Sequence, residues 1–521
     1  MSTNLANDLL TIGDETKPIA TEISERLSQE LVIALVGPVG SGVSSVASLI
    51  GDVLDRDFSY RVCPIIKPSQ IIQAEMHRVG MAVPARKPLD AYIDAMQTAG
   101  NLLRERFGNN YLSEKVVERI YKFRSESGGY KNGVLLPGRR AYIIDSIKNE
   151  EELNLLKQIY RDTLIVFGVF APDEIRKQRL VDAGADPERV KNIIDRDEGE
   201  VATFGQKTRK IFVRSDFFIR NDRTREELRS KVVRYLDIIF DAVIHTPTKA
   251  ESAMYEASAA ASNSACMSRQ VGAAIVSPAG ELIGVGWNDV PKFGGGLYRE
   301  DDRWSVDVHR KAIIDTDNRC FKWGGNVCHN EMRRKGIIDK LVSLILNSGI
   351  ARRGTRDQDV RAAISGTEID SLIEFSRSIH AEMEAILSVA REGKHSLVGS
   401  TLYTSVYPCH NCARHIVASG ITSVVFIEPY AKSLALELHR DSITELPDDN
   451  VRVVFRQYDG VAPHSYLRLF RPAADRKKNG RLDSRIKGIS IPVFRVLLDA
   501  QADYEAKVIA DLTSKEQSAS A

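Results

Sequence analysis

The amino-acid sequence predicts an α/β protein of two or three domains, and three observations support this fold class. The chain has 521 residues, whereas a typical domain has roughly 100–200. Short apolar runs alternate with charged, helix-compatible stretches through the first half, which is the pattern of a parallel sheet covered by helices. The second half opens with a helix and a β-hairpin pattern before strands and helices alternate again. A parallel-sheet domain followed by a second α/β domain is therefore expected.

The predicted strands of the first domain are short, continuous apolar runs. They are Leu31–Val36, Ala141–Ile144, Leu164–Phe170 and Phe217–Ile219. Charged helical stretches lie between and after them, at Lys148–Arg161, Asp173–Asp182 and Arg223–Ala242. We expect a polar segment over residues 1–30 and a domain over residues 31–245, because the last helical pattern stops near His245.

The second domain begins with an Ala/Ser-rich helical stretch, Glu251–Ser268. Two strand patterns follow, Val271–Val276 and Glu281–Trp287, joined by a turn that contains Pro278 and Gly280. Further on, we expect helices that open at His380 and Cys409, and strands at Thr401–Ser405, Ile421–Ile427 and Val451–Phe455. These elements predict a domain over residues 250–470 with an insertion at 289–375, followed by a basic and helical tail at 471–521.

The composition narrows the class of protein. Lys and Arg number 72 and Asp and Glu 70, so the net charge of +2 implies no strong field for nucleic acid or an anionic membrane. Six cysteines in so long a chain exclude a disulfide-dense secreted scaffold. The N-terminus has no cationic region followed by an apolar core, and no run of about 18 apolar residues exists. We therefore expect a cytoplasmic protein without a membrane partner.

A metal-binding pattern stands in the second half. His380 and Glu382 form H-x-E, and Pro408, Cys409 and Cys412 form P-C-x-x-C, with Cys409 standing 29 positions after His380. One imidazole and two thiolates suit Zn²⁺, and three protein ligands leave a coordination position open for water. Glu382 stands beside this ligand set, where it can carry a proton. The alternatives are a structural zinc site completed by a fourth ligand, or buried Cys and His without metal.

The full pattern H-x-E…P-C-x-x-C is the signature of zinc-dependent nucleobase deaminases. The segment Met254–Asn288 also resembles the opening of deoxycytidylate deaminases, with an Ala-rich helix, S-x-R-Q-V-G-A, a strand and G-x-N. The resemblance covers roughly residues 250–470 and implies a cytidine deaminase-like α/β/α fold with a five-stranded sheet. It also implies that Asn288 contacts the sugar of the substrate and that Arg269 lies near its phosphate-bearing end.

The chain departs from that family in two places. Met383 and Glu384 follow the H-x-E motif where the family usually has a different polar pair, and the stretch between Asn288 and His380 is unusually long. This insertion contains Cys320, Cys328 and His329. These three residues offer the ligands for a second zinc ion; the alternative is ordinary buried cysteine and partly solvated histidine.

A glycine-rich loop follows the first predicted strand and precedes a helix, which is the context of a phosphate-binding loop, G-x-x-x-x-G-K-[ST]. Its glycines and hydroxyl are Gly37, Gly40, Gly42 and Ser44. Val43 occupies the position of the lysine that reaches the terminal phosphates of a nucleotide. Ser44 remains available for Mg²⁺, and Asp145 ends a strand in the position of a second, acidic Mg²⁺ group.

The first domain as a whole resembles the P-loop nucleotide kinases. The resemblance implies a kinase-like parallel sheet that binds a nucleotide with Mg²⁺, with kinase activity impaired or absent because of Val43. Lys67, after another apolar run, could supply the missing charge; a solvated lysine is the alternative. A structural β–α turn without a ligand is the alternative for the loop itself.

The pairing of both domains resembles the bacterial anti-phage dCTP deaminases. This resemblance implies zinc-dependent hydrolysis of dCTP and dCMP to dUTP and dUMP, which depletes dCTP during phage infection. It further implies homo-oligomers and, in some systems, an inhibitory small RNA as partners. Three alternatives stay open: a housekeeping dCMP deaminase with a nucleotide-sensing domain, an RNA- or DNA-editing cytidine deaminase, and a non-catalytic binding protein.

Overall fold

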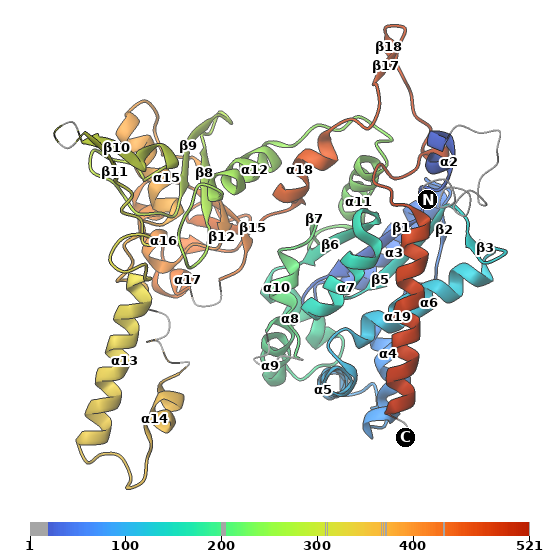
Figure 1. Cartoon of the computed structure of the whole chain (residues 1–521), viewed down its shortest axis with the longest axis horizontal. Coiled ribbons are helices and arrows are strands. Elements are labelled where there is room, and N and C mark those ends of the chain that lie inside the picture. Colours follow the sequence, from blue (N-terminus) through green and yellow to red (C-terminus); the bar gives the residue numbers. More distant parts are fainter. Residues whose placement is uncertain are drawn as a thin grey trace, which may run out of the picture. The chain divides into compact units, whose positions relative to one another are not determined.

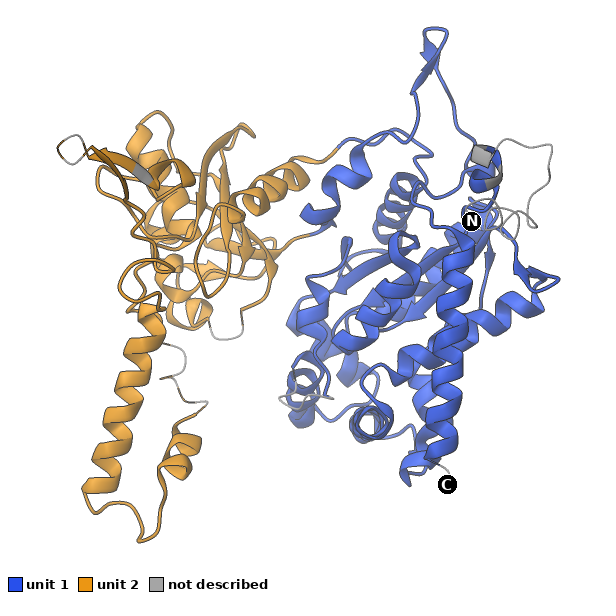
Figure 2. Ribbon diagram, viewed as in Figure 1, with its two compact units in different colours: residues 1–246, 459–521 blue, residues 247–458 orange. Residues whose placement is uncertain are grey.

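The structure is a computed structural model that describes residues 19–199, 205–307, 309, 311–365, 367, 369, 372–430 and 433–519. The chain divides into two compact units (Figure 2). Unit 1 comprises residues 1–246 and 459–521, and unit 2 comprises residues 247–458. Residues 1–18 of the expected polar segment 1–30 lie outside the described residues. No helix in the described ranges is long and apolar enough to cross a membrane.

Unit 1 is built on a six-stranded sheet in the order β16-β7-β6-β1-β5-β2 (Figure 1). Its strands are β1 (Leu31–Val36), β2 (Arg61–Val62), β5 (Arg140–Asp145), β6 (Leu164–Phe170), β7 (Phe217–Arg220) and β16 (Gly460–Val461). β2, β5, β1, β6 and β7 run parallel, and β16 is antiparallel to β7. Every residue of β1, β5 and β6 is buried, as expected where helices cover both faces of a parallel sheet. The predicted α/β class is confirmed.

The helices of unit 1 form where the sequence supplies caps and apolar stripes. Asn149 and Glu152 form a capping box at the start of α7, and Thr224 caps α11. Side chains of α3 and α11 pack with Leu31, Ile33 and Leu35 of β1 in one core. The helices are α2 (Ile19–Glu25), α3 (Val43–Arg56), α4 (Pro68–Glu75), α5 (Leu89–Phe107), α6 (Tyr111–Glu126), α7 (Glu150–Tyr160), α8 (Asp173–Asp182), α9 (Pro187–Glu198), α10 (Thr208–Phe212), α11 (Arg225–Ile239), α18 (Pro463–Phe470) and α19 (Leu498–Ser518).

The C-terminal segment differs from the expected division into a domain at 250–470 and a tail at 471–521. Residues 459–521 belong to unit 1, and α19 runs along α6 (Figure 1). The physical reason is a buried ion network: the Arg124 guanidinium lies 2.8 Å from a Glu30 carboxylate oxygen and also pairs with Glu505 of α19. Because buried charges are stable only when paired, this network holds α19 against the body of unit 1.

Unit 2 contains a six-stranded sheet in the order β14-β15-β13-β12-β8-β9. Its strands are β8 (Gly272–Val276), β9 (Leu282–Trp287), β12 (Thr401–Val406), β13 (Ser423–Glu428), β14 (Ile443–Thr444) and β15 (Val453–Gln457). β8 and β9 form the expected antiparallel hairpin, and β12, β13 and β15 run parallel. The resemblance implied five strands; the sixth is the two-residue β14.

The helices of unit 2 are α12 (Lys249–Ala261), α13 (His329–Asn347), α14 (Asp357–Ile364), α15 (Ala381–Glu392), α16 (His410–Ala418) and α17 (Ala435–Leu438). α12 ends at Ala261, before the predicted Ser268. The insertion carries α13, α14 and the antiparallel pair β10 (Trp304–Asp307) and β11 (Ala312–Asp315). Short two-stranded pairs elsewhere in the chain are β3 (Tyr130–Lys131) with β4 (Val134–Leu135) and β17 (Lys477–Lys478) with β18 (Arg481–Leu482).

Candidate functional site

The two halves of the metal-binding pattern each stand at the start of a helix. His380 is the N-cap residue of α15, and Cys409 is the N-cap residue of α16. α15 lies close against β9, because a Cβ atom added to Gly286 would meet the Ala381 carbonyl oxygen at 2.3 Å. Only glycine permits this approach, which brings His380 to the sheet. The partial positive charge of a helix N-terminus also favours a thiolate at Cys409.

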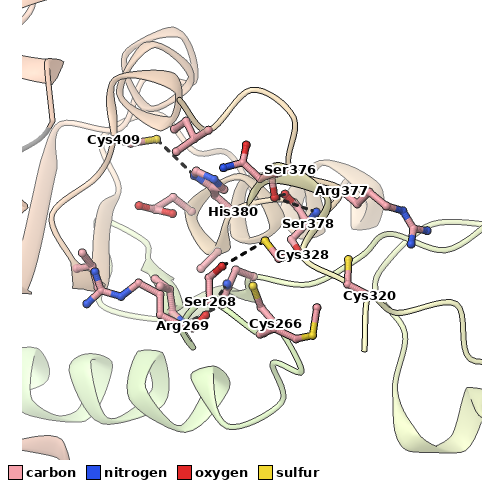
Figure 3. Close-up of a pocket in the computed structure, with 18 of the residues that line it drawn as sticks. Cys266, Ser268, Arg269, Cys320, Cys328, Ser376, Arg377, Ser378, His380 and Cys409 are labelled. Atoms are coloured by element: carbon pink, nitrogen blue, oxygen red, sulfur yellow. Dashed lines mark hydrogen bonds between the residues drawn. The ribbon is translucent and has the colours of Figure 1, made fainter. Parts of the chain in front are cut away.

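The structure brings His380, Cys409 and Cys412 together. Nδ1 of His380 lies 3.3 Å from the sulfur of Cys409 (Figure 3) and 3.3 Å from the sulfur of Cys412. In the described ranges, this is the one group of three or more His, Cys, Asp or Glu ligand atoms that all lie within 4.8 Å of one another. One imidazole nitrogen and two sulfurs fit Zn²⁺ and leave its fourth tetrahedral position to a ligand from outside the chain.

The electrostatics of these groups agree with a metal-ligating role. A hydrogen bond with Cys412 and the neighbouring His380 lower the pKa of Cys409 to about 4. The hydrogen bond with Cys409 raises the pKa of His380 to about 9, and the pKa of Cys412 is raised by its hydrogen bond with Cys409 and by burial. Without metal the group therefore retains protons, which a metal ion must displace when it binds.

Glu382 lies beside the ligand group but is not part of it. Its side chain is 4% exposed, and its Oε2 atom lies 3.5 Å from the sulfur of Cys412. Burial raises the pKa of Glu382, because a charged carboxylate loses its hydration. A buried carboxyl group with a raised pKa, at the wall of a pocket, is suited to take up and release a proton.

A pocket of about 290 Å³ opens onto these side chains. Asn288 and Arg269, which the resemblance implied to contact the sugar and to lie near the phosphate, also line it; Figure 3 labels Arg269. The Asn288 amide is already used within the chain: its oxygen accepts from the Val271 N–H at 2.7 Å and its nitrogen donates to the Arg269 carbonyl at 2.8 Å. The Arg269 guanidinium forms an ion pair with Glu428. Asn288 thus shapes the turn that presents Arg269 to the pocket.

The pocket also contains residues that the sequence analysis did not single out for this site. Cys266, Arg377 and Tyr430 line it. The Arg377 guanidinium lies 4.0 Å from the centre of the Trp323 ring. The insertion supplies part of the wall through Cys320, Cys328 and Ile373. No spacing signal marks these residues, because they lie in three separate segments of the chain that line one pocket only in the folded domain.

The predicted second zinc site is not assembled in the described part of the chain. Cys320, Cys328 and His329 line the same pocket, but they do not form a close group of ligand atoms. Cys328 lies 3.7 Å from the Ser268 hydroxyl instead, away from Cys409 (Figure 3). Cys328 is the N-cap residue of α13 with an extended backbone conformation, and His329 is the first residue of the helix.

Unit 1 forms the predicted glycine-rich loop. Gly40 and Gly42 adopt positive φ angles of 81° and 79°, which favour glycine. The Ser44 hydroxyl donates to Asp145 Oδ2 at 2.6 Å, and Lys67 Nζ lies 3.5 Å from the same oxygen. Both groups expected to ligate Mg²⁺ thus have partners within the protein, and Lys67 is paired with a carboxylate rather than simply solvated.

The second unit is similar in sequence to known deaminases. The sequence model of the cytidine and deoxycytidylate deaminase zinc-binding region matches residues 247–428. The deoxycytidylate deaminase of Enterobacteria phage T4 is 30% identical over 190 residues, which cover 36% of this chain and 80% of the phage protein. ComE operon protein 2 of Bacillus subtilis is 39% identical over 64 residues, 11% of this chain and 33% of that protein.

Two solved structures are similar to parts of this chain. The apo dCMP deaminase of cyanophage S-TIM5 is 16% identical, with a TM-score of 0.22 over 41% of this chain and 100% of that one. A shikimate kinase from Acinetobacter baumannii is 13% identical, with a TM-score of 0.23 over 43% of this chain and 98% of that one. Family membership rests on the sequence matches rather than on these two likenesses.

Proposed function

Because the chain belongs to the cytidine and deoxycytidylate deaminase family, we propose that unit 2 hydrolyses the amino group of deoxycytidine nucleotides, converting dCMP to dUMP and dCTP to dUTP. One observation carries this proposal above all: His380, Cys409 and Cys412 gather their ligand atoms within 4.8 Å, and His380, Cys409 and Glu382 line one pocket. A structural site would need neither the open coordination position nor the buried carboxyl group.

The residues present fit a zinc ion. His380, Cys409 and Cys412 would hold it, because an imidazole and two thiolates are ligands that Zn²⁺ prefers. When bound, zinc supplies Lewis-acid chemistry that lowers the pKa of water. The pocket of about 290 Å³ reaches two of these ligands, His380 and Cys409, so we place the pyrimidine ring of the substrate there.

Glu382 carries the proton of the reaction. Its carboxylate takes a proton from the attacking water and delivers it to N3 of cytosine, as the new C4–O bond forms. The same carboxylate then passes the proton of the new C4 hydroxyl group to N4, the C4–N4 bond breaks, ammonia leaves, and the C4 carbonyl of uracil remains. Water and deoxycytidine nucleotide are thus converted to ammonia and deoxyuridine nucleotide. Burial of Glu382 favours this shuttle, because its raised pKa brings the protonated and deprotonated forms closer in energy at neutral pH.

Two further residues would orient the nucleotide. Arg269 is 44% exposed at its side chain and lines the pocket, so its guanidinium is available to a phosphate group. It now pairs with Glu428, and a phosphate would have to compete with that carboxylate. Asn288 holds the Arg269–Val271 turn and faces the same pocket, where we place the sugar.

We extend the proposal to the biological role. Depletion of dCTP during phage infection is supported by the resemblance of the paired domains to anti-phage dCTP deaminases. The same resemblance is our ground for proposing a cytoplasmic homo-oligomer that a small RNA can inhibit. A housekeeping dCMP deaminase is the second candidate, since the family match and the phage T4 relative concern unit 2 alone.

The test is a product assay. We would incubate the purified full chain with dCMP, dCTP, CMP and single-stranded oligonucleotides, and measure ammonia and the uracil product. The proposal expects deamination of dCMP and dCTP. Activity on oligonucleotides but not on free nucleotides would instead show an editing enzyme, and activity on dCMP alone would favour the housekeeping role.

A further inference from the structure

Unit 1 contains a pocket of about 480 Å³ to which neither the deaminase motif nor the glycine-rich loop contributes. It is lined by Phe240, the C-cap residue of α11, and by residues of the segment 473–495; we call it the C-terminal pocket. The Phe240 ring is 2% exposed and stacks on the Phe58 ring, with 4.4 Å between their centres. The pocket therefore opens onto the apolar core of unit 1, and a volume of this size is typical of ligand sites.

Three hydrogen bonds fix the wall of the C-terminal pocket to the body of unit 1. The Val493 N–H donates to the Ile239 carbonyl at 3.0 Å, and the Ala473 N–H donates to the Asp241 carboxylate at 3.0 Å. The Arg485 guanidinium donates to the Asp241 carbonyl at 2.6 Å. The wall is therefore formed before any partner binds, which lowers the entropy that binding costs.

The segment that forms this pocket is strongly basic. Residues 471–495 contain eight Lys or Arg and only two Asp, although the whole chain has a net charge of only +2. Arg485 and Arg495 line the pocket, and no acidic residue in the described part of the chain lines it. Arg485 is paired with Asp241, whereas Arg495 is exposed. A partner that carries carboxylates would therefore be attracted to this surface.

Large aliphatic side chains are exposed on the same segment. Leu482, Ile486 and Ile489 are 64%, 64% and 72% exposed, and the last two line the pocket. Single exposed aliphatic residues are common, but three within eight positions, beside an apolar pocket, mark an interaction surface. Nucleic acid would leave these side chains uncovered, and a membrane surface would leave the pocket unfilled. A protein segment with both carboxylates and aliphatic side chains therefore fits this surface best.

The chain itself contains a segment of this composition. Residues 1–18, which lie outside the described residues, have four aliphatic residues of the Leu and Ile type and three acidic residues against one lysine. The aliphatic residues are Leu5, Leu9, Leu10 and Ile12, and the acidic ones are Asp8, Asp14 and Glu15. The charge of this segment is thus opposite to that of residues 471–495.

The chain that follows residues 1–18 lies next to the segment that forms the pocket. Leu27, just after α2, forms an antiparallel β-bridge with Leu497, just before α19 (Figure 1). The Ser28 N–H donates to the carbonyl of Val496, the residue after Arg495, at 2.8 Å. An extended stretch of 18 residues spans up to about 60 Å, so residues 1–18 are long enough to reach the pocket.

We propose that the C-terminal pocket binds residues 1–18 of the same chain. The aliphatic side chains of that segment cover Ile486 and Ile489, and its carboxylates meet Arg495 and the neighbouring cations. The contact fastens the two ends of unit 1 to each other and removes an exposed aliphatic surface from water. The proposal does not depend on the deamination proposed for unit 2, because the pocket and its occupant both belong to unit 1.

The experiment is hydrogen–deuterium exchange on the full-length protein. Residues 484–495 should exchange at least roughly fivefold faster in the double variant Leu9→Asp/Ile12→Asp than in the parent, because aliphatic side chains no longer cover the pocket. Thr11→Asp is the matched control, since it adds a carboxylate between these two positions without removing an aliphatic side chain. It should exchange as the parent does.

A synthetic peptide of residues 1–18 tests the same contact in trans. Added to the double variant, it should restore slow exchange of residues 484–495, and a peptide with serine at its four aliphatic positions should not. Introduced into the double variant, Arg495→Glu and Ile489→Asp should each weaken peptide binding by roughly tenfold or more. Lys191→Glu, an exposed substitution on α9 outside the pocket wall, is the control and should leave peptide binding unchanged.

The proposal would be wrong if residues 484–495 exchanged alike in the parent and in the folded double variant, or if the peptide failed to protect the double variant. Protection that rose with protein concentration would assign the pocket to a second copy of the chain instead. Protection by phosphatidylglycerol vesicles or by a single-stranded oligonucleotide, without protection by the peptide, would assign it to a membrane or to nucleic acid. None of these results bears on the proposed deamination, which is assayed separately through its products.

Discussion

The deaminase pocket of unit 2 and the pocket at the glycine-rich loop of unit 1 are both built at the N-termini of helices, but only the pocket of unit 2 has reactive side chains at those positions. In unit 2 the N-cap residues of α15 and α16, His380 and Cys409, carry the reactive side chains themselves. In unit 1 the N-cap residue of α3 is Gly42, and the motif provides only backbone and a hydroxyl. The positive charges of that pocket come from side chains outside the motif: Lys67, Arg104, Lys148 and Arg179. The contrast shows that the shape of a motif and its chemistry can be supplied by different parts of a chain.

The largest expected effect comes from removing one metal ligand from the pocket of unit 2. Cys409→Ala should lower bound zinc from about one ion per chain to a small fraction and abolish deamination, because two ligands hold zinc far more weakly than three. Metal analysis and the ammonia assay measure the two effects. Cys63→Ala is the matched control, since Cys63 is a buried thiol of unit 1. Full activity in zinc-free protein would contradict the metal assignment.

The next effect separates the proton carrier from the metal ligands. Glu382→Gln should retain zinc but lower kcat by at least roughly 10²-fold, because the amide cannot accept and return the proton. Steady-state kinetics with dCMP and metal analysis check this. Glu392→Gln, an exposed substitution at the other end of α15, should behave as wild type. Near-normal turnover in Glu382→Gln would show that another group moves the proton.

The pocket at the glycine-rich loop should bind a nucleotide without catalysing phosphoryl transfer. Transfer needs a cation held at the terminal phosphates, but Val43 is apolar, and Lys67 and Lys148 are each paired with a carboxylate. Incubation with radiolabelled ATP and nucleoside monophosphates should therefore give no product above a protein-free blank. Rapid transfer would mean that Lys67 and Lys148 replace the motif lysine in full. The contrast between the two pockets would then disappear.

A smaller effect concerns the docking of the C-terminal segment on unit 1. Burial opposes the charge of Asp216, but hydrogen bonds with His464, Ser465 and the Val166 N–H outweigh it and lower its pKa. Because the folded-state pKa lies below the unfolded value of about 3.8, this stabilisation is present above pH 4 and is lost as the pH falls through the folded pKa.

Asp216→Asn should therefore lower the free energy of unfolding at pH 7 by about 1–3 kcal/mol and by less in acid. Urea unfolding at several pH values measures this. Asp475→Asn, in an exposed position, is the control and should show no comparable change. An equal loss of stability at pH 7 and at pH 3 would show that the Asp216 charge is not the cause.

The prediction of elements succeeded where one local signal was sufficient. The buried runs Leu31–Val36 and Leu164–Phe170 are strands with the same bounds as predicted, because a strand covered on both faces is apolar throughout. Helices α5 and α6 were not predicted. Their buried faces include polar side chains such as Asn101 and Glu114, which obscure the apolar periodicity.

The candidate sites also separate into those that a local signal predicts and those that it does not. The spacing of His380, Glu382, Cys409 and Cys412 was enough to anticipate one cluster, since each half of the motif stands at a helix start. The set Cys320, Cys328 and His329 failed as a second cluster, because ligand types without a constraining geometry do not determine where side chains point. The sequence did not predict that Gln97 lines the pocket at the glycine-rich loop, because a single glutamine in a helix belongs to no binding motif.

By itself, the sequence determined the α/β class, the strands that are buried throughout, the ligand group of unit 2 and the backbone of the glycine-rich loop. Each of these depends on residues within one element or on two motifs that each begin a helix. Only the tertiary structure decided that residues 459–521 complete unit 1, that Arg377 and Cys266 line the deaminase pocket, and that the buried Gln97 lines one pocket with the glycine-rich loop. These facts depend on contacts between residues far apart in the chain, where burial and the pairing of charges, rather than local spacing, determine which groups meet.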